Sequence, residues 1–242
     1  MSSDLPAGAV SLAAAPPEAE QVFGSALPLA VRYAELLATD GVERGLLGPR
    51  EVPRLWERHL LNCAVMAGLV PADAEVVDVG SGAGLPGIVI ALLRPSVRMI
   101  LLEPMLRRTV FLEECVAALG LANVTVHRGR AEDAAGTLQA DVATSRAVAP
   151  LDRLVPWSIG VLRPGGTILA IKGRDAEAEL DQAGPLLRRL GVQSADVVQA
   201  GQGIVEPPAT VVRILTGETG GKRQQTGHRR QPPGARRPRR RR

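Results

Sequence analysis

The stretch VVDVGSGAGLPGI, at residues 76–88, decides the fold. Valines on both sides of Asp78 predict a short buried strand, because β-branched side chains favour extended backbone. Three glycines at alternate positions then predict a turn that a ligand can approach closely, and Pro86 is a residue type that opens helices. A strand, a glycine turn and a helix N-terminus present backbone N–H groups to a ligand, so this stretch predicts a nucleotide-type cofactor site.

The spacing of the glycines narrows the choice of cofactor. A dinucleotide-binding fingerprint that begins at Gly80 needs its third glycine at position 85, which is leucine here. The glycines instead fall at Gly80, Gly82 and Gly84, with Asp78 two residues before the first, and this pattern resembles motif I of the S-adenosylmethionine-dependent methyltransferases. We therefore predict that these four residues bind S-adenosylmethionine, with an NAD site and an ordinary tight turn as the alternatives.

The composition limits the chain to one main domain. Its 242 residues, 45% of them hydrophobic, can bury one core, and two Trp, one Tyr and two Phe leave little surface for stacking bases. Cys63 and Cys115 match no metal-ligand spacing, so we expect two reduced, buried thiols and no metal site. The N-terminal residues include Asp4 and no basic region of a leader sequence, and no apolar run approaches the ~18 residues of a membrane span. We therefore expect a soluble, cytoplasmic protein that does not contact a membrane.

Positive charge is concentrated at the C-terminus. Residues 217–242 hold ten of the 29 Lys and Arg residues and one of the 25 Asp and Glu residues, a net charge of +9, so the remaining residues carry −5. The tail is rich in Gly, Pro, Gln and Arg and has no large apolar side chain to pack. We predict a disordered arm that contacts RNA phosphates, with a solvated solubility tail as the alternative.

The chain divides into four segments. We predict a disordered N-terminus at 1–17, a helical cap at 18–70, a methyltransferase core at 71–216 and the disordered Arg-rich tail at 217–242. In the cap, apolar spacing predicts helices from Glu18 to Leu47 and from Pro53 to Met66. The expected inner positions are Val22, Leu29, Tyr33, Leu36 and Leu37 in the first helix and Leu55, Leu60, Val65 and Met66 in the second.

Basic residues line the other side of the second predicted helix. Arg54, Arg58 and His59 could contact an RNA phosphate or the edge of the cofactor from there. Ordinary surface charge with a satisfied histidine is the alternative.

Strands and helices alternate after the glycine turn. The predicted order is helix 86–93, strand 97–102, helix 104–119, strand 123–127, strand 141–145, helix 151–162, strand 167–171 and helix 176–190. Residues 192–198 and 210–215 flank a Gly/Pro loop and predict an antiparallel hairpin at the sheet edge. The predicted fold is therefore α/β and Rossmann-like, a mainly parallel seven-stranded sheet with an antiparallel last strand, which is the arrangement of the class I S-adenosylmethionine-dependent methyltransferases.

Three strand ends supply further candidate site residues, because ligands bind at the carboxyl ends of parallel strands. Glu103 closes the second strand, where a carboxylate can accept both ribose hydroxyls of an adenosine. Ala131 and Glu132 follow the third strand, where a backbone N–H and a carboxylate could read the adenine edge. Arg146 ends the fourth strand, beside the reactive methyl group. Exposed loop residues are the alternative for Glu103 and for Ala131 with Glu132.

The segment at residues 145–148 decides which acceptor is methylated. It lacks the Asn/Asp-Pro-Pro-aromatic pattern of amino-directed nucleic-acid methyltransferases, and both cysteines lie on the wrong elements for a pyrimidine C5 enzyme. An acceptor that is already nucleophilic remains, such as guanine N7, which needs alignment but no base. We predict that Arg146 donates to guanine O6 or to the cofactor, and that Lys172 and Arg174 hold phosphates.

Four segments together resemble one family. Residues 77–88, Leu101–Glu103, Thr144–Ala147 and Ile171–Gly173 are similar to the RsmG (GidB) family of small-subunit ribosomal RNA guanine-N7 methyltransferases, over a match from about Tyr33 to Leu215. The resemblance implies S-adenosylmethionine as cofactor and a guanine in the 530 loop of 16S rRNA, free or in the 30S subunit, as substrate. It also implies cofactor contacts at Gly80, Leu85, Ala131, Glu132 and Arg146. We further expect a monomer.

The cap departs from the family pattern. Many members have Trp-Asn and Asn-Leu-Thr where this chain has Leu37–Asp40 and Gly45–Gly48, and the usual Arg-His-x-x-Asp-Ser ends here in Asn62 and Cys63. These changes concern how the cap meets RNA and leave the cofactor residues intact. Two alternative functions remain. One is a non-catalytic role in ribosome assembly through RNA binding, and the other is that of an NAD-dependent oxidoreductase.

Overall fold

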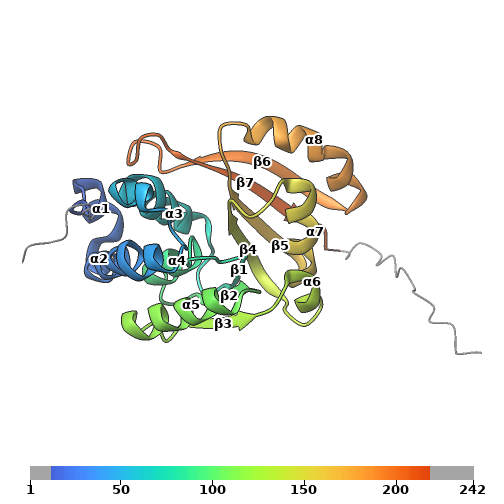
Figure 1. Ribbon diagram of the computed structural model, residues 1–242. Coiled ribbons are helices and arrows are strands. Elements are labelled where there is room, and N and C mark those ends of the chain that lie inside the picture. Colours follow the sequence, from blue (N-terminus) through green and yellow to red (C-terminus); the bar gives the residue numbers. More distant parts are fainter. Residues whose placement is uncertain (1–11, 219–242) are drawn as a thin grey trace, which may run out of the picture.

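Seven strands form one mixed sheet in the computed structural model, which describes residues 12–218 (Figure 1). Across the sheet they follow the order β3-β2-β1-β4-β5-β7-β6. Their bounds are β1 Glu75–Val79, β2 Arg98–Glu103, β3 Val124–Arg128, β4 Ala140–Arg146, β5 Leu162–Ile171, β6 Val192–Ala200 and β7 Ala209–Thr216. The strand order reverses at β1 and β4, and open α/β sheets bind their ligands at such a point.

The pairing confirms the predicted fold class. The first five strands pair in parallel, and β7 is antiparallel to both β5 and β6. The predicted hairpin is therefore present, but β7 inserts between β5 and β6, so that β6 and not the last strand forms the edge.

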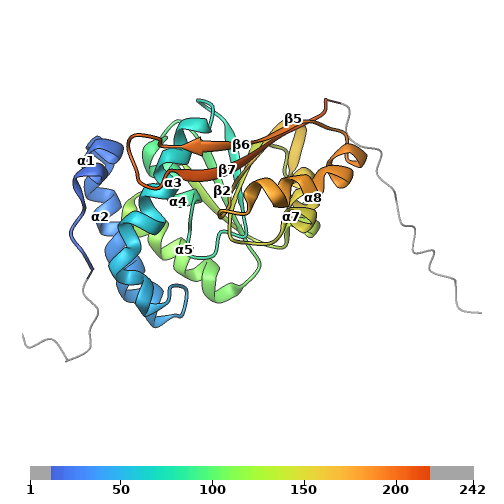
Figure 2. The same ribbon diagram turned by 90° about the horizontal axis from the view of Figure 1, so that it is seen from above.

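Helices cover both faces of the sheet (Figures 1 and 2). The bounds in the core are α4 Gly87–Leu93, α5 Leu106–Leu119, α6 Ala131–Ala134, α7 Leu151–Val161 and α8 Ala176–Arg189. Side chains of β1 alternate between two apolar clusters: Val76 packs with the cap, α4 and α5, whereas Val77 and Val79 pack with α6, α7 and α8. Burial on both faces explains the run of valines around Asp78.

The cap consists of short helical segments where we predicted two continuous helices. They are α1 Pro17–Phe23, η1 Gly24–Ala26, α2 Leu27–Leu36, η2 Leu37–Gly41, η3 Pro49–Arg54, η4 Leu55–Leu61, α3 Asn62–Met66 and η5 Ala67–Leu69. Gly24, with φ 48°, ends α1, and Pro53 lies inside η3. These residues interrupt regular α-helix because one favours left-handed backbone and the other lacks an N–H donor.

Most of the predicted inner positions of the cap are buried, including Tyr33, Leu37 and Leu60. The prediction for Leu29 is wrong, since this side chain is 39% exposed. Leu29 lies in the first turn of α2, beside the buried side of this helix, which carries Ala30, Tyr33 and Ala34.

The described part of the N-terminal segment lies against the cap. The indole N–H of Trp56 donates to the Ala13 carbonyl (3.0 Å), and Leu12 and Ala15 pack on the core. Contacts thus begin within the segment predicted to be disordered, while residues 1–11 of that segment and 219–242 of the Arg-rich tail lie outside the described residues. No helix in the stretch 12–218 is long and apolar enough to cross a membrane.

Candidate active site

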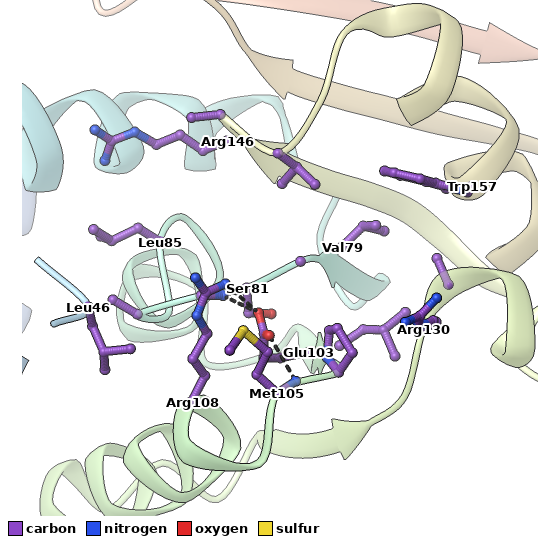
Figure 3. A pocket seen from close by; sticks show the side chains of 18 of the residues that line it. Leu46, Val79, Ser81, Leu85, Glu103, Met105, Arg108, Arg130, Arg146 and Trp157 are labelled. Carbon is purple, nitrogen blue, oxygen red and sulfur yellow. Dashed lines mark hydrogen bonds and ion pairs between the residues drawn. The ribbon is translucent and has the colours of Figure 1, made fainter. Parts of the chain in front are cut away.

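A cavity of about 770 Å³ opens at the carboxyl ends of β1, β2 and β4 (Figure 3). Its wall comes from the glycine turn, the segments that follow β2, β3 and β4, the first half of α7 and the cap. The predicted cofactor residues that line it are Gly80, Gly82, Leu85, Glu103, Ala131, Glu132 and Arg146. Asp78 and Gly84 are not part of this wall.

Two glycines of the turn face different surroundings. A Cβ atom at Gly82 would meet only the Gly80 carbonyl oxygen, at 3.8 Å, so this position is open to a ligand. A Cβ atom at Gly84 would overlap Ile88 and lie 2.8 Å from the Tyr33 hydroxyl. Both residues have positive φ, 60° and 97°. Gly82 therefore leaves space in the cavity, whereas Gly84 allows the turn to pack against the cap.

Asp78 is fully buried beneath the turn. Its Oδ2 accepts a hydrogen bond from the Gly87 N–H (3.1 Å), and its Oδ1 accepts one from the Thr144 hydroxyl (3.2 Å). Burial raises the pKa of Asp78 to about 7, against the opposing effect of these hydrogen bonds. Because the contacts join β1 to the start of α4 and to β4, Asp78 holds the turn in place from outside the cavity wall.

Hydrogen-bond donors near the carboxyl end of β2 hold the Glu103 carboxylate in place (Figure 3). Its Oε2 accepts from the Gly82 N–H (3.0 Å) and its Oε1 from the Met105 N–H (3.0 Å), while Arg108 Nη1 lies 3.5 Å from Oε2. A carboxylate has about four lone-pair sites and three are taken here, so Glu103 can accept one ribose hydroxyl while it keeps these partners. The Nε of Arg108 is buried and has no partner among the described residues, which leaves one more donor beside the carboxylate.

The far side of the cavity is built by α6 and α7. Ala131 and Glu132 begin α6 and lie in the wall as predicted. On α7, the guanidinium of Arg153 lies over the Trp157 ring, 5.7 Å from its centre. The charged residues of the whole wall are Arg108, Arg130, Arg146 and Arg153 against Glu103 and Glu132, a local net charge of +2. This positively charged wall favours an anionic ligand more than the rest of the body does, because the body as a whole is mildly acidic.

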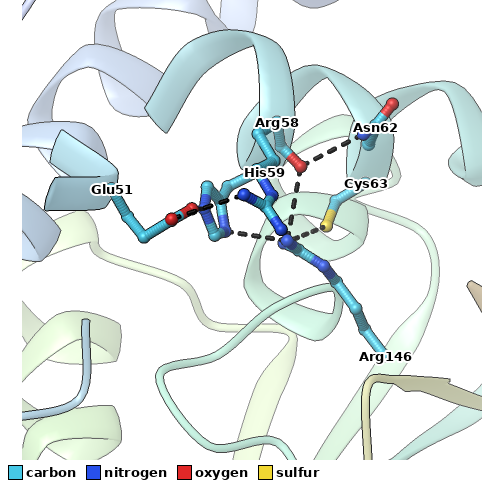
Figure 4. A network of polar contacts seen from close by, with 6 residues as sticks. All are labelled: Glu51, Arg58, His59, Asn62, Cys63 and Arg146. Carbon is cyan, nitrogen blue, oxygen red and sulfur yellow. Dashed lines mark hydrogen bonds and ion pairs between the residues drawn. The ribbon is translucent and has the colours of Figure 1, made fainter. Parts of the chain in front are cut away.

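Arg146 ends β4 and points away from Glu103, toward the cap (Figures 3 and 4). Its Nη2 donates to His59 Nδ1 (2.8 Å) and to the Arg58 carbonyl (3.3 Å), and its Nη1 lies 3.7 Å from Cys63 Sγ. The next residue, Ala147, has φ 51°, an uncommon conformation for a residue with a Cβ atom. Arg146 is thus positioned by elements of both the core and the cap.

Neither cysteine is a thiolate. Burial raises the pKa of Cys63 to about 11 and that of Cys115 to about 12, and neither residue lines the cavity. Both are reduced and buried, as predicted. A covalent mechanism through cysteine therefore finds no nucleophile at this site.

The predicted RNA-binding residues differ in solvent exposure and in the partners of their side chains. Arg54, Arg58 and Arg174 are exposed, and Arg58 lies 3.4 Å from Glu51. Lys172 is only 11% exposed, and its Nζ donates to Glu179 (2.8 Å) and to the Ala149 carbonyl (2.8 Å). It lines a second cavity of about 580 Å³ on the other side of the loop after β4. Its position fits a support for that loop better than a phosphate contact.

Sequence reasoning missed several residues of the cavity wall, chiefly Arg108, Arg130, Arg153 and Trp157. Arg108 lies in the first turn of α5, five residues after Glu103, and Arg153 and Trp157 are one turn apart on α7. The signal that could have found them is their place in the first turns after a strand end, because those turns face the same rim of the sheet.

Comparisons with known proteins match the chain to one family. The family model described as "rRNA small subunit methyltransferase G" matches residues 26–206. The chain is 56% identical over 219 residues to the protein named ribosomal RNA small subunit methyltransferase G from Thermobifida fusca, covering 89% of this chain and 92% of that protein. It is 57% identical over 214 residues to the protein of the same name from Streptomyces avermitilis, covering 88% and 90%.

Solved structures share the fold at low sequence identity. An S-adenosylmethionine-dependent O-methyltransferase from Thermotoga maritima superposes with a TM-score of 0.52 at 14% identity, covering 65% of each chain. At this identity the likeness concerns the fold alone.

Proposed function

Because the chain belongs to the rRNA small subunit methyltransferase G family, we propose that it transfers the methyl group of S-adenosylmethionine to N7 of a guanine in the 530 loop of 16S rRNA. Family membership and the class I fold confirm the predicted family and the predicted cofactor. The proposal adds two points to the family assignment: the acceptor atom, which is guanine N7, and its place in the 530 loop of 16S rRNA.

The observation that carries the proposal is the absence of a free imidazole or thiolate from the described cavity wall. His59 is the one imidazole in that wall, and its two nitrogens are engaged by Arg146 and Glu51. Of the two carboxylates in the wall, Glu103 already accepts from backbone N–H groups, and Glu132 begins α6 on the far side of the cavity. Guanine N7 has a lone pair in the plane of the ring and loses no proton, so approach and alignment are sufficient for its reaction.

The cavity fits the cofactor. Gly82 leaves open space where a side chain would project, and the unpartnered Nε of Arg108 lies beside a carboxylate with one spare lone-pair site. When bound, the cofactor supplies an electrophilic methyl group on a sulfonium centre. We assign Glu103 to one of the ribose hydroxyls and Ala131 with Glu132 to the adenine edge. We also assign cofactor contacts to Gly80, Gly82 and Leu85. Arg146 lies near the reacting methyl group in this arrangement.

Asp78 and Gly84 act indirectly in this proposal. Both shape the turn, one through its hydrogen bonds to Gly87 and Thr144 and the other by leaving room for Tyr33 and Ile88. Replacing either one would therefore weaken the cofactor site through the backbone.

We assign RNA phosphates to the exposed Arg54, Arg58 and Arg174 and to the C-terminal arm. Lys172 is more deeply placed and bonded to Glu179, so we give it a supporting role in the loop after β4. Charged contacts of this kind raise affinity without reading sequence.

One experiment separates the proposal from its alternatives. The purified protein is tested for binding of labelled S-adenosylmethionine against NADH, then incubated with 30S subunits and with free 16S rRNA that lack the modification, and the methylated nucleotide is mapped by mass spectrometry. Methyl transfer to guanine N7 is expected, and Arg146→Ala should lose it while Arg98→Ala, at the opposite end of the sheet, should not. Cofactor binding without any methylated rRNA would favour the assembly role, and NADH binding would favour the oxidoreductase.

A further inference from the structure

A chain of polar contacts crosses from the cap to the end of β4 (Figure 4). Glu51 Oε2 lies 2.8 Å from His59 Nε2, and His59 Nδ1 lies 2.8 Å from Arg146 Nη2. Glu51 belongs to η3 and His59 to η4, whereas Arg146 is the last residue of β4. The chain of contacts therefore joins the two parts of the molecule at the cavity wall.

The partners of His59 determine which nitrogen carries its proton. A guanidinium can only donate, so Nδ1 must accept from Arg146 and carries no hydrogen. A carboxylate can only accept, so Nε2 carries the hydrogen and donates it to Glu51. His59 is thus a neutral imidazole in the Nε2–H form, and a second proton on Nδ1 would place two donors face to face.

The surroundings of His59 favour this neutral form. The residue is 8% exposed, and the charged groups that face it are Glu51 from η3, Arg58 from its own segment and Arg146 from β4. Cys63, which contacts Arg146 from α3, remains a neutral thiol. Burial and the charge of Arg146 lower the pKa of His59, and the contact with Glu51 opposes this shift.

We propose that Glu51 and His59 are positioning residues, which hold the Arg146 guanidinium at the cavity wall only while the imidazole is neutral. The inference rests on the proposed function for the role of Arg146 in methyl transfer. Protonation of His59 removes the nearer of the two acceptors of Nη2 and adds a positive charge beside the guanidinium, so Arg146 is released in acid. The cap thereby makes methyl transfer depend on pH on the acid side.

The first test reads the imidazole directly in the cofactor-free protein. The chain has three histidines, so a ¹⁵N–¹H correlation spectrum of the rings is simple, and the signal lost in His59→Asn identifies the residue. We expect the neutral Nε2–H form at pH 7.5 and a titration midpoint below the ordinary histidine value. Glu51→Gln removes the charge that raises this pKa, so the midpoint should fall further. Glu57→Gln, on the exposed side of the same segment, is the matched control and should leave it unchanged.

The second test follows methyl transfer as a function of pH. His59→Ala should lower kcat by roughly 10- to 100-fold at pH 7.5, because a misplaced group can cost about that much. His59→Asn can present an amide oxygen to Arg146 and does not titrate, so it should recover part of the rate and lose the acid limb of the profile. Glu51→Gln should move that limb to lower pH, whereas a purely structural role would change the rate and leave the limb where it is. Thermal unfolding of each variant identifies any loss of fold.

The outcomes distinguish this inference from the proposed function. An Nδ1–H imidazole at neutral pH, or a midpoint that Glu51→Gln and Glu57→Gln move equally, would overturn it. So would an acid limb that persists unchanged in His59→Asn. If His59 titrates as expected while the wild-type protein methylates no guanine, the proposed function fails and the holding of Arg146 by His59 stands.

Discussion

Two charged side chains at strand ends line the same cavity and are held in opposite ways. Glu103, at the end of β2, takes its partners from the core itself: Gly82, Met105 and Arg108 lie 21, 2 and 5 residues away in the chain. Arg146, at the end of β4, takes its partners from the cap, 83 to 88 residues away. The first arrangement belongs to the methyltransferase core, and the second exists only when the cap is docked.

This difference separates the two tasks of the site. We expect cofactor binding to depend mainly on the end of β2 and on the turn after β1, and methyl transfer to depend on the end of β4 and its contacts with the cap. Variants on the two sides should therefore change different measurements.

The largest effect should come from the side of the turn that faces the cap. Gly84→Ala combines an unfavourable φ with overlap on Ile88 and Tyr33, so we expect it to lower the free energy of unfolding by roughly 3 kcal/mol or more. Gly82→Ala meets no such overlap and should cost about 1 kcal/mol in stability, yet weaken cofactor binding at least about tenfold. Urea unfolding and calorimetric titration with S-adenosylmethionine measure both quantities. Equal stability losses in the two variants would contradict our division of the turn.

The next effect compares the two strand ends directly. Glu103→Ala removes the acceptor of two backbone N–H groups and of the ribose, so cofactor affinity should fall by about 100-fold. Arg146→Ala should leave affinity within about tenfold of the wild type while methyl transfer is lost. The dissociation constant from calorimetry and kcat from labelled cofactor provide the comparison. A larger loss of affinity in Arg146→Ala than in Glu103→Ala would reverse our assignment of the two ends.

A third prediction concerns the buried carboxyl group beneath the turn. The pKa of Asp78 is raised to about 7, so in the folded protein the group keeps a proton that the unfolded chain releases near pH 4. Its contribution to stability is present below pH ~4 and is lost as the pH rises toward 7, by about 2 kcal/mol between pH 5 and 8. Asp78→Asn should lack this loss, whereas Asp181→Asn, an exposed control on α8, should keep it. Urea unfolding at several pH values measures the difference, and parallel curves for the wild type and Asp78→Asn would disprove the raised pKa.

The smallest effect on the folded protein should come from the C-terminal arm, which follows from the sequence alone. Truncation after Gly217 removes a net charge of +9, so we expect weaker binding to 16S rRNA or 30S subunits and a flatter dependence on salt. Cofactor affinity and the identity of the modified guanine should not change, since an arm without aromatic residues contacts phosphates and cannot read bases. Binding over a salt series, with a map of the methylated nucleotide, checks both parts. Coincident salt slopes would identify the arm as a solubility tail, and a different modified nucleotide would make it a specificity element.

Local patterns were sufficient for most of the fold. Alternating apolar segments predicted the strands of the core and its helices except the four-residue α6, and the two runs at 192–198 and 210–215 predicted the hairpin of β6 and β7. The cap was predicted less well, because residues such as Gly24 interrupt its helical segments.

The site divides in the same way. The sequence by itself determined the glycine turn, the carboxylate at the end of β2 and the arginine at the end of β4, since each follows from a strand and the residue after it. Only the tertiary structure decided that Asp78 and Gly84 lie behind the cavity wall, that Lys172 is bonded to Glu179, and that Glu51 and His59 hold Arg146. The physical reason is that side-chain partners are chosen by the packing of elements distant in the chain, which local spacing does not encode.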